Sequence, residues 1–154
     1  MKINQAMRQI TVAKTYALTS LDLSFLDLTE IPSQIVSLTS LTHLNLSHNH
    51  LTHIPEEIGS LKNLRHLSLN NNQLTHFPEC ILKLKKLEVL DIGVNHIEEI
   101  PENIHELKAL VQLFFYRNNL KKVPDSIAEL SNLQFLSLNI NPIFPFPKIG
   151  RAHV

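Results

Sequence analysis

Residues 41–63 read LTHLNLSHNHLTHIPEEIGSLKN, and this stretch decides the fold because the chain repeats its pattern with a constant period. Asparagine recurs every 23 residues at Asn49, Asn72, Asn95, Asn118 and Asn141, and proline does so at Pro32, Pro55, Pro78, Pro101, Pro124 and Pro147. Aligned on these positions, six segments share the template LxxLxLxxNxLxxIPxxIxxLxx and begin at Leu18, Leu41, Leu64, Leu87, Leu110 and Leu133. A constant period without insertions predicts copies that stack on one another.

One copy of the template predicts a strand, a turn and a short helical segment. The LxL step alternates apolar and polar residues, which is typical of a strand with its leucines on one face. Identical strands one period apart can pair only in parallel. The inward asparagine needs hydrogen bonds, so we expect a ladder of asparagines bonded to the adjacent turn. The Ile-Pro step, followed by acids such as Glu56 and Glu57, favours a helical turn that begins at the proline.

The pattern resembles the leucine-rich repeat family in its typical 23-residue form, over residues 18 to about 147. The resemblance implies an α/β fold: a curved, horseshoe-shaped solenoid with a parallel β-sheet on the concave face and short helical or 3-10 segments on the convex face. It also implies a recognition scaffold, because leucine-rich arrays mostly bind other proteins. Similar short arrays occur in bacterial proteins, including secreted effectors, and in eukaryotic scaffolds of the Ras-suppressor and Scribble type.

The two ends of the array depart from the template. Residues 1–17 carry Ile3, Met7, Ile10 and Ala13 at helical spacing, which predicts an amphipathic capping helix ahead of repeats that fill residues 18–154. Leu26 stands where the first repeat should have its asparagine, as expected for a terminal copy. The last repeat is irregular: Ile143, Phe146 and Pro147 keep the register without a following helix. Either Phe144 and Phe146 fold over this end, or the native protein continues.

Composition excludes several classes of function. Lys and Arg (14) balance Asp and Glu (14), so no net field favours nucleic acid or an anionic membrane. No stretch approaches the roughly 20 apolar residues of a membrane span, and the N-terminus lacks the core of a cleavable signal peptide. The single cysteine, Cys80, excludes an intrachain disulfide, and we expect it on the exposed convex side. These features favour a monomer in the cytoplasm, or one translocated into a host cell if it is a bacterial effector.

The variable strand positions of the template identify the candidate binding surface. Positions three, five, seven and eight should project from the concave sheet, and repeats four to six place aromatic and aliphatic residues there. The FFYR run puts Phe115 in the core and leaves Phe114 and Tyr116 outside. Exposed aromatics beside an arginine are typical of protein-binding hot spots, although they could merely shield the sheet. The predicted partner-binding residues are Val89, Asp91, Val94, Phe114, Tyr116, Arg117, Phe135 and Ile140, together with His43 and His66 from the polar half.

The dense histidines of residues 43–53 do not predict a metal site. His43 and His66 should stack as neighbours in adjacent repeats, and so should His53 and His76, but each group is only a pair. A structural zinc site takes four ligands and a catalytic one usually three. Protonating both members of a pair adds repulsion, so we expect their pKa values to fall and couple, which would make binding vary with pH.

No catalytic constellation stands out from the repeat. Serines near histidines lack a carboxylate and an oxyanion donor, and no phosphate-binding loop occurs. We therefore predict a non-enzymatic module without cofactor or metal that binds a protein partner on its concave face, as a bacterial effector or scaffold. Two alternatives remain: a substrate-targeting segment of a larger enzyme, and a pH- or metal-modulated binder that uses the histidine pairs.

Overall fold

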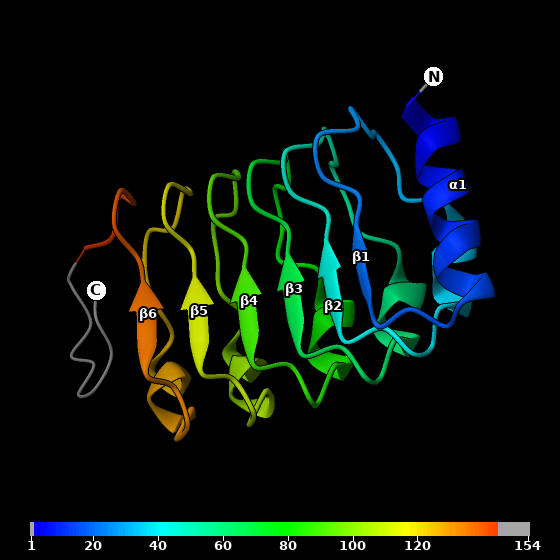
Figure 1. The fold of residues 1–154 in the computed structure, drawn as a ribbon. Coiled ribbons are helices and arrows are strands. Elements are labelled where there is room, and N and C mark those ends of the chain that lie inside the picture. The colour runs from blue at the N-terminus through cyan, green and yellow to red at the C-terminus, as the bar shows by residue number, and fades with distance from the viewer. Residues whose placement is uncertain (1, 145–154) are drawn as a thin grey trace.

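The computed structural model describes residues 2–144 and shows a single row of parallel strands, with the N-terminal helix at the β1 end of the row (Figure 1). Helix α1 spans Lys2–Thr15. The strands are β1 (Ser20–Asp22), β2 (His43–Asn45), β3 (His66–Ser68), β4 (Val89–Asp91), β5 (Gln112–Phe114) and β6 (Phe135–Ser137). They pair in parallel in chain order, and each residue is opposite the one 23 positions later, as Leu44 is opposite Leu67. The predicted leucine-rich repeat solenoid is confirmed.

Each strand buries its central leucine and presents its two flanking residues on the other face of the sheet, the open face. The buried set is Leu21, Leu44, Leu67, Leu90, Leu113 and Leu136. Five 3-10 segments form the opposite layer, and the core lies between this layer and the sheet (Figure 1): η1 (Ser33–Ser37), η2 (Glu56–Ser60), η3 (Glu79–Lys83), η4 (Glu102–Glu106) and η5 (Asp125–Glu129). Each segment begins one residue after the proline, not at it, because that proline is still extended, with ψ of 144° at Pro55.

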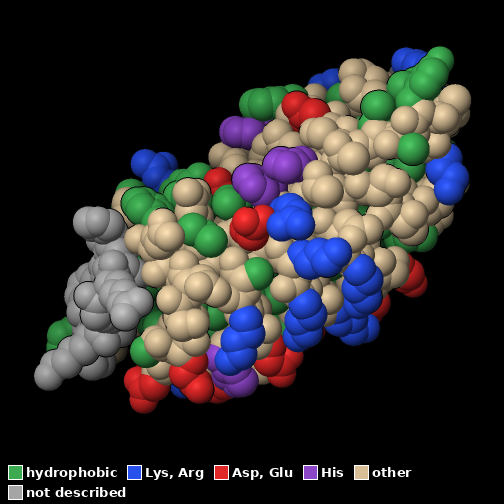
Figure 2. All heavy atoms as spheres, turned by 60° about the horizontal axis from the view of Figure 1, so that its bottom comes forward, with side chains coloured by type: hydrophobic (Ala, Val, Ile, Leu, Met, Phe, Trp, Pro, Cys, Tyr) green, Lys and Arg blue, Asp and Glu red, His purple; other side chains and the backbone are tan. Residues whose placement is uncertain are grey.

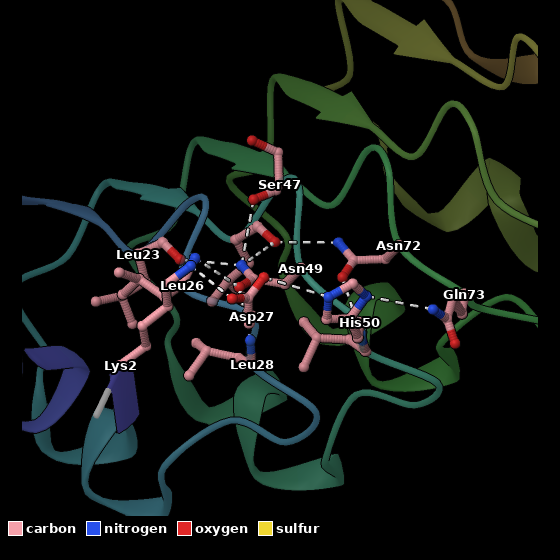
Figure 3. A network of polar contacts seen from close by, with 12 residues as sticks. Lys2, Leu23, Leu26, Asp27, Leu28, Ser47, Asn49, His50, Asn72 and Gln73 are labelled. Atoms are coloured by element: carbon pink, nitrogen blue, oxygen red, sulfur yellow. Dashed lines mark hydrogen bonds and ion pairs between the residues drawn. The ribbon is translucent and has the colours of Figure 1, made fainter. Parts of the chain in front are cut away.

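The asparagine ladder is present and joins each repeat to the one before it (Figure 3). The Asn49 side-chain oxygen accepts from the backbone N–H groups of Leu26 and Leu28, at 3.1 and 2.9 Å. Its amide nitrogen donates to the carbonyls of Leu23 and Leu46, both at 3.0 Å. The same pattern recurs one repeat later at Asn72. The buried amide is therefore satisfied by backbone alone, as its place in the template predicts.

Helix α1 covers the β1 end of the core, as predicted, with one change in the residues that face it. Ala6, Ile10 and Ala13 are buried and Ile3 packs partly against them. Met7, which we expected on this face, is only half-buried, because the inward stripe passes through Ala6. The small side chain there lets the helix approach the first repeat closely.

The predicted exposure of Cys80 is wrong, and Phe144 does not adopt the covering position that was one of two alternatives for the last repeat. Cys80 is not an exposed thiol: it is 1% exposed, and burial raises its pKa to about 11. The reason lies in the preceding repeat, where Gly59 lets η2 approach η3. A Cβ at Gly59 would lie 3.0 Å from the Cys80 carbonyl oxygen. At the other end Phe144 is 86% exposed and does not cover the last repeat. Phe146 and Pro147 lie outside the described residues.

Candidate functional site

A shallow hollow of about 410 Å³ runs along the open face of the sheet from β1 to β5. Five of the predicted site residues line it: His43, His66, Val89, Asp91 and Phe114. Alternation along each strand places them, because the residues on both sides of the buried leucine point away from the core. The other polar residues of the lining are Ser20, Asp22, Asn45 and Ser68.

Aromatic side chains form a connected group at the β5 end of this hollow. The Phe114 ring lies 5.1 Å from the Phe135 ring and 6.5 Å from the Tyr116 ring, which it meets edge to face. Phe114 and Tyr116 are half-buried, and Phe115 between them is fully buried, as the alternation predicts. Figure 2 shows hydrophobic side chains (green) gathered between the histidines (purple) and the β6 end of the molecule.

Gly93 is a site residue that the sequence prediction missed. A Cβ built on it would lie 2.3 Å from Cε1 of Tyr116, so a side chain there would displace the tyrosine ring from its place over this turn. The chain has three glycines in all, and this one occupies a variable position of the open face. The scarcity of glycine in this sequence is the signal that could have identified Gly93 as a site residue.

Asp91 lies on β4 beside Phe114, its register partner on β5. One carboxylate oxygen accepts from the Gly93 N–H and the other from the Asn70 amide, each at 3.0 Å. Burial raises the pKa of Asp91, while these two hydrogen bonds lower it. Burial also raises the pKa of Tyr116, and the charge of Asp91 adds to that effect. The carboxylate is therefore half-desolvated among aromatic groups.

The histidines of residues 43–53 contact different neighbours. The His43 and His66 rings lie 4.2 Å apart, as predicted. The expected partnership of His53 with His76 is not seen in residues 2–144, where each ring contacts the threonine before it. The pKa of His66 is lowered, first by burial and then by repulsion from His43, while Glu88 raises it. The expected repulsion from His43 contributes to the lowered pKa of His66, but desolvation is the larger cause.

The remaining site residues, Val94, Arg117 and Ile140, do not line the hollow but lie just past the strand ends. All three have left-handed backbone, with φ of 51°, 52° and 58°. Asn71 and His48 adopt the same conformation, one and two repeats before Val94 respectively. Asparagine tolerates the left-handed conformation, whereas a β-branched residue such as valine or isoleucine adopts it only with backbone strain. The sequence prediction missed this strain, which sets the direction of the exposed Ile140 side chain.

A larger hollow of about 660 Å³ lies elsewhere, at the edge where the later strands begin. Its lining includes Arg65, Lys85 and Lys86, and Figure 2 shows a strip of Lys and Arg (blue) along this edge. Arg65 pairs with Glu88 at 3.1 Å and Lys85 with Glu106 at 3.3 Å, all exposed. Exposed pairs of this kind are typical of a solvated surface, so we place the candidate site at the open face.

No group of three His, Cys, Asp or Glu side chains within residues 2–144 is arranged to hold a metal ion. In the same residues, no helix is both long enough and apolar enough to cross a membrane.

The fold and the open-face site together define a repeat scaffold, and the chain belongs to the leucine-rich repeat family. The family profile described as "Leucine-rich repeat region" matches residues 50–142, and that described as "Leucine rich repeat" matches residues 16–74. Proteins with this fold are typically non-enzymatic protein–protein interaction modules. A comparison with curated protein sequences gives no significant match.

Three solved structures show the range of similar proteins. A leucine-rich repeat protein of Leptospira interrogans is 37% identical with a TM-score of 0.83, over 89% of this chain and 36% of that one. The ectodomain of the Arabidopsis thaliana receptor kinase GASSHO1/SCHENGEN3, in complex with CASPARIAN STRIP INTEGRITY FACTOR 2, is 31% identical with a TM-score of 0.70, over 80% and 16%. An internalin of Listeria monocytogenes is 26% identical with a TM-score of 0.65, over 79% and 35%. The chain thus spans about a third or less of each.

Proposed function

We propose that the chain binds a protein partner on the open face of its sheet, through the aromatic group at β5 and β6. The observation that carries this proposal is the contact of Phe114 with Tyr116 and Phe135 beside the hollow. Large aromatic side chains next to Arg117 supply the contact area that hot spots use. Val89, Val94 and Ile140 would add apolar contact around them, with His43 and His66 at the polar half.

Backbone strain supports the same surface. Val94 and Ile140 occupy left-handed positions that an asparagine, as at Asn71, would fill at lower cost. Strain of this kind persists where a side chain has a use that outweighs it. Contact with a partner is such a use, because the left-handed residue projects from the rim of the open face.

The finer role that we propose is that of a bacterial effector or scaffold. The similarity to proteins of Leptospira and Listeria supports a bacterial origin. The GASSHO1/SCHENGEN3 ectodomain, solved in complex with another factor, supports ligand capture by such an array. Because this chain spans a small part of each similar protein, a targeting segment within a larger enzyme remains the alternative.

The test is affinity capture with mass spectrometry, followed by titration of the partner that is found. The double variant Phe114→Ala/Tyr116→Ala should lose at least about thirtyfold in affinity, the effect of removing a hot spot worth about 2 kcal/mol. The matched control is Tyr16→Ala/Phe25→Ala, which removes two exposed aromatics at the other end of the array. Capture that survives the first double variant, with an unchanged melting temperature, would place the contact surface elsewhere.

Binding that varies with pH is a second candidate function, supported by the His43–His66 contact. Because the pKa of His66 is lowered, its ring becomes charged only below the usual histidine range. That charge would enter a hollow which also holds His43, Asp22 and Asp91, with Glu88 nearby. The folded chain binds this proton more weakly than the unfolded chain, so stability also falls as the pH decreases through that range. We expect partner affinity to change between about pH 7 and pH 5, with His66→Gln flattening the profile. Equal partner affinities at these two pH values would contradict pH-dependent binding.

A further inference from the structure

The hollow on the open face is lined by negatively charged side chains without positively charged ones. Its lining contains the carboxylates of Asp22 and Asp91 and no lysine or arginine. Burial and repulsion from His43 lower the pKa of His66, which disfavours a compensating positive charge on that ring. The chain as a whole carries no net charge, so this local excess of negative charge is a property of the site.

The negative charge of Asp91 is not needed for the fold. Its Oδ1 accepts from the backbone N–H two residues on, at 3.0 Å, and this bond closes the strand end. The same position two repeats earlier is Asn45, whose neutral side chain accepts from the Ser47 N–H at the same distance. An amide at this position therefore makes the same bond to the backbone as the carboxylate does. The charge adds a desolvation cost without adding a backbone hydrogen bond.

No cation in the described part of the chain compensates Asp91. Its hydrogen-bond partners, the Gly93 N–H and the Asn70 amide, are both neutral. The salt bridges in residues 2–144 involve other acids: Asp27, Glu88 and Glu106. Within the hollow the half-buried carboxylate is thus paired only with neutral donors.

The surroundings of Asp91 fit a flat cation better than a compact one. Phe114 is its neighbour across the β4–β5 register, and Tyr116 lies over Gly93, whose N–H binds the same carboxylate. An arginine guanidinium is planar, can stack on an aromatic face and binds a carboxylate through two N–H groups. An ammonium group can satisfy the charge but makes no such stack.

From this geometry we infer that the hollow receives an arginine side chain of the protein partner, with its guanidinium on Asp91 and stacked against Phe114. The inference rests on the proposed function, because it names the chemistry of the partner at the same surface. It assigns Asp91 a specific recognition role, whereas the aromatic group supplies general contact area.

A random peptide library displayed on phage provides the probe. Selection on the wild-type chain should enrich arginine, and selection on Asp91→Asn should return arginine to its level in the starting library. Asp125→Asn is the matched control, because Asp125 is an exposed acid on the 3-10 layer. A wild-type peptide should lose about tenfold to a hundredfold in affinity for Asp91→Asn. Replacing its arginine by the neutral isostere citrulline should cause the same loss, with little further loss when both changes are combined.

The stability of Asp91→Asn separates this role from a structural one. Since Asn45 shows that an amide fits the position, the variant should melt at the wild-type temperature or higher while it binds less. Selected peptides that bind Asp91→Asn as well as wild type, or that tolerate citrulline, would overturn the inference and leave the proposed function standing if Phe114→Ala/Tyr116→Ala still abolishes binding. Peptides that bind regardless of both variants, or selection of none, would overturn both.

Discussion

Asn118→Ala should lower the free energy of unfolding by about 3–5 kcal/mol, because a buried amide that serves three parts of the backbone would disappear. The Asn118 side-chain oxygen accepts from the Ile97 N–H at 3.0 Å, and its nitrogen donates to the carbonyls of Ile92 and Phe115 at 3.1 Å. Alanine leaves these groups without a partner, and each buried unpaired group costs about 1–3 kcal/mol. Urea denaturation followed by circular dichroism measures the loss as a lower midpoint with a similar slope.

The adjacent residue provides the control. Asn119 is exposed, and its backbone N–H is bonded to the Ile97 carbonyl at 2.9 Å, while its side chain makes no hydrogen bond within residues 2–144. Asn119→Ala should therefore stay within about 0.5 kcal/mol of wild type, as surface substitutions usually do. If the two variants unfold at the same urea concentration, the ladder is not a major source of stability.

The period of the sequence predicted the strands, their pairing and the asparagine ladder. Strands that pair 23 residues apart, buried central leucines and the ladder at Asn49 and Asn72 all repeat with the same environment, so one copy specifies the others. In a solenoid each repeat contacts only its neighbours, which makes such local rules sufficient.

Features set by differences between neighbouring repeats were not predictable in this way. Cys80 is buried because Gly59, in the preceding repeat, lacks a side chain. Tyr116 lies over Gly93 for the same kind of reason. The template treats these positions as variable and exposed, so it predicts the opposite for Cys80. A pairwise comparison of side-chain sizes in successive repeats would have found both.

The candidate site also combines features that the template predicts with features that it does not. Its place on the open face follows from alternation along the strands, and the predicted residues of β2 to β5 do line one hollow. The His43–His66 contact was predicted, whereas the contacts of the other histidines depend on turn conformation that the template does not specify. His48 has a φ of 55° and stacks on Phe25 at 4.1 Å. His53 and His76 occupy matching positions, yet each ring contacts its own threonine.

Phe115→Ala should cost about 3–5 kcal/mol of stability, the range for removing a buried phenylalanine from a packed core. Phe115 is fully buried and lies 6.2 Å, ring to ring, from Phe77. The corresponding position in the other repeats holds Leu23, Leu46, Leu69, Ile92 and Leu138. Alanine would leave a cavity opposite Phe77 that the neighbouring repeats, fixed by their own ladders, could fill only partly. Thermal and urea unfolding measure this loss.

Phe115→Leu restores the side chain that other repeats use, so it should recover most of the loss and end within about 1.5 kcal/mol of wild type. Phe114→Ala, one residue earlier, should show the reverse pattern: a stability loss of about 1 kcal/mol or less, because its ring is partly in solvent, together with weaker partner binding. Two adjacent phenylalanines thus separate the two tasks of the strand, because alternation sends one ring into the core and the other onto the open face. Phe115→Ala with wild-type stability, or Phe114→Ala with the larger loss, would mean that the core and the open face are assigned to the wrong residues.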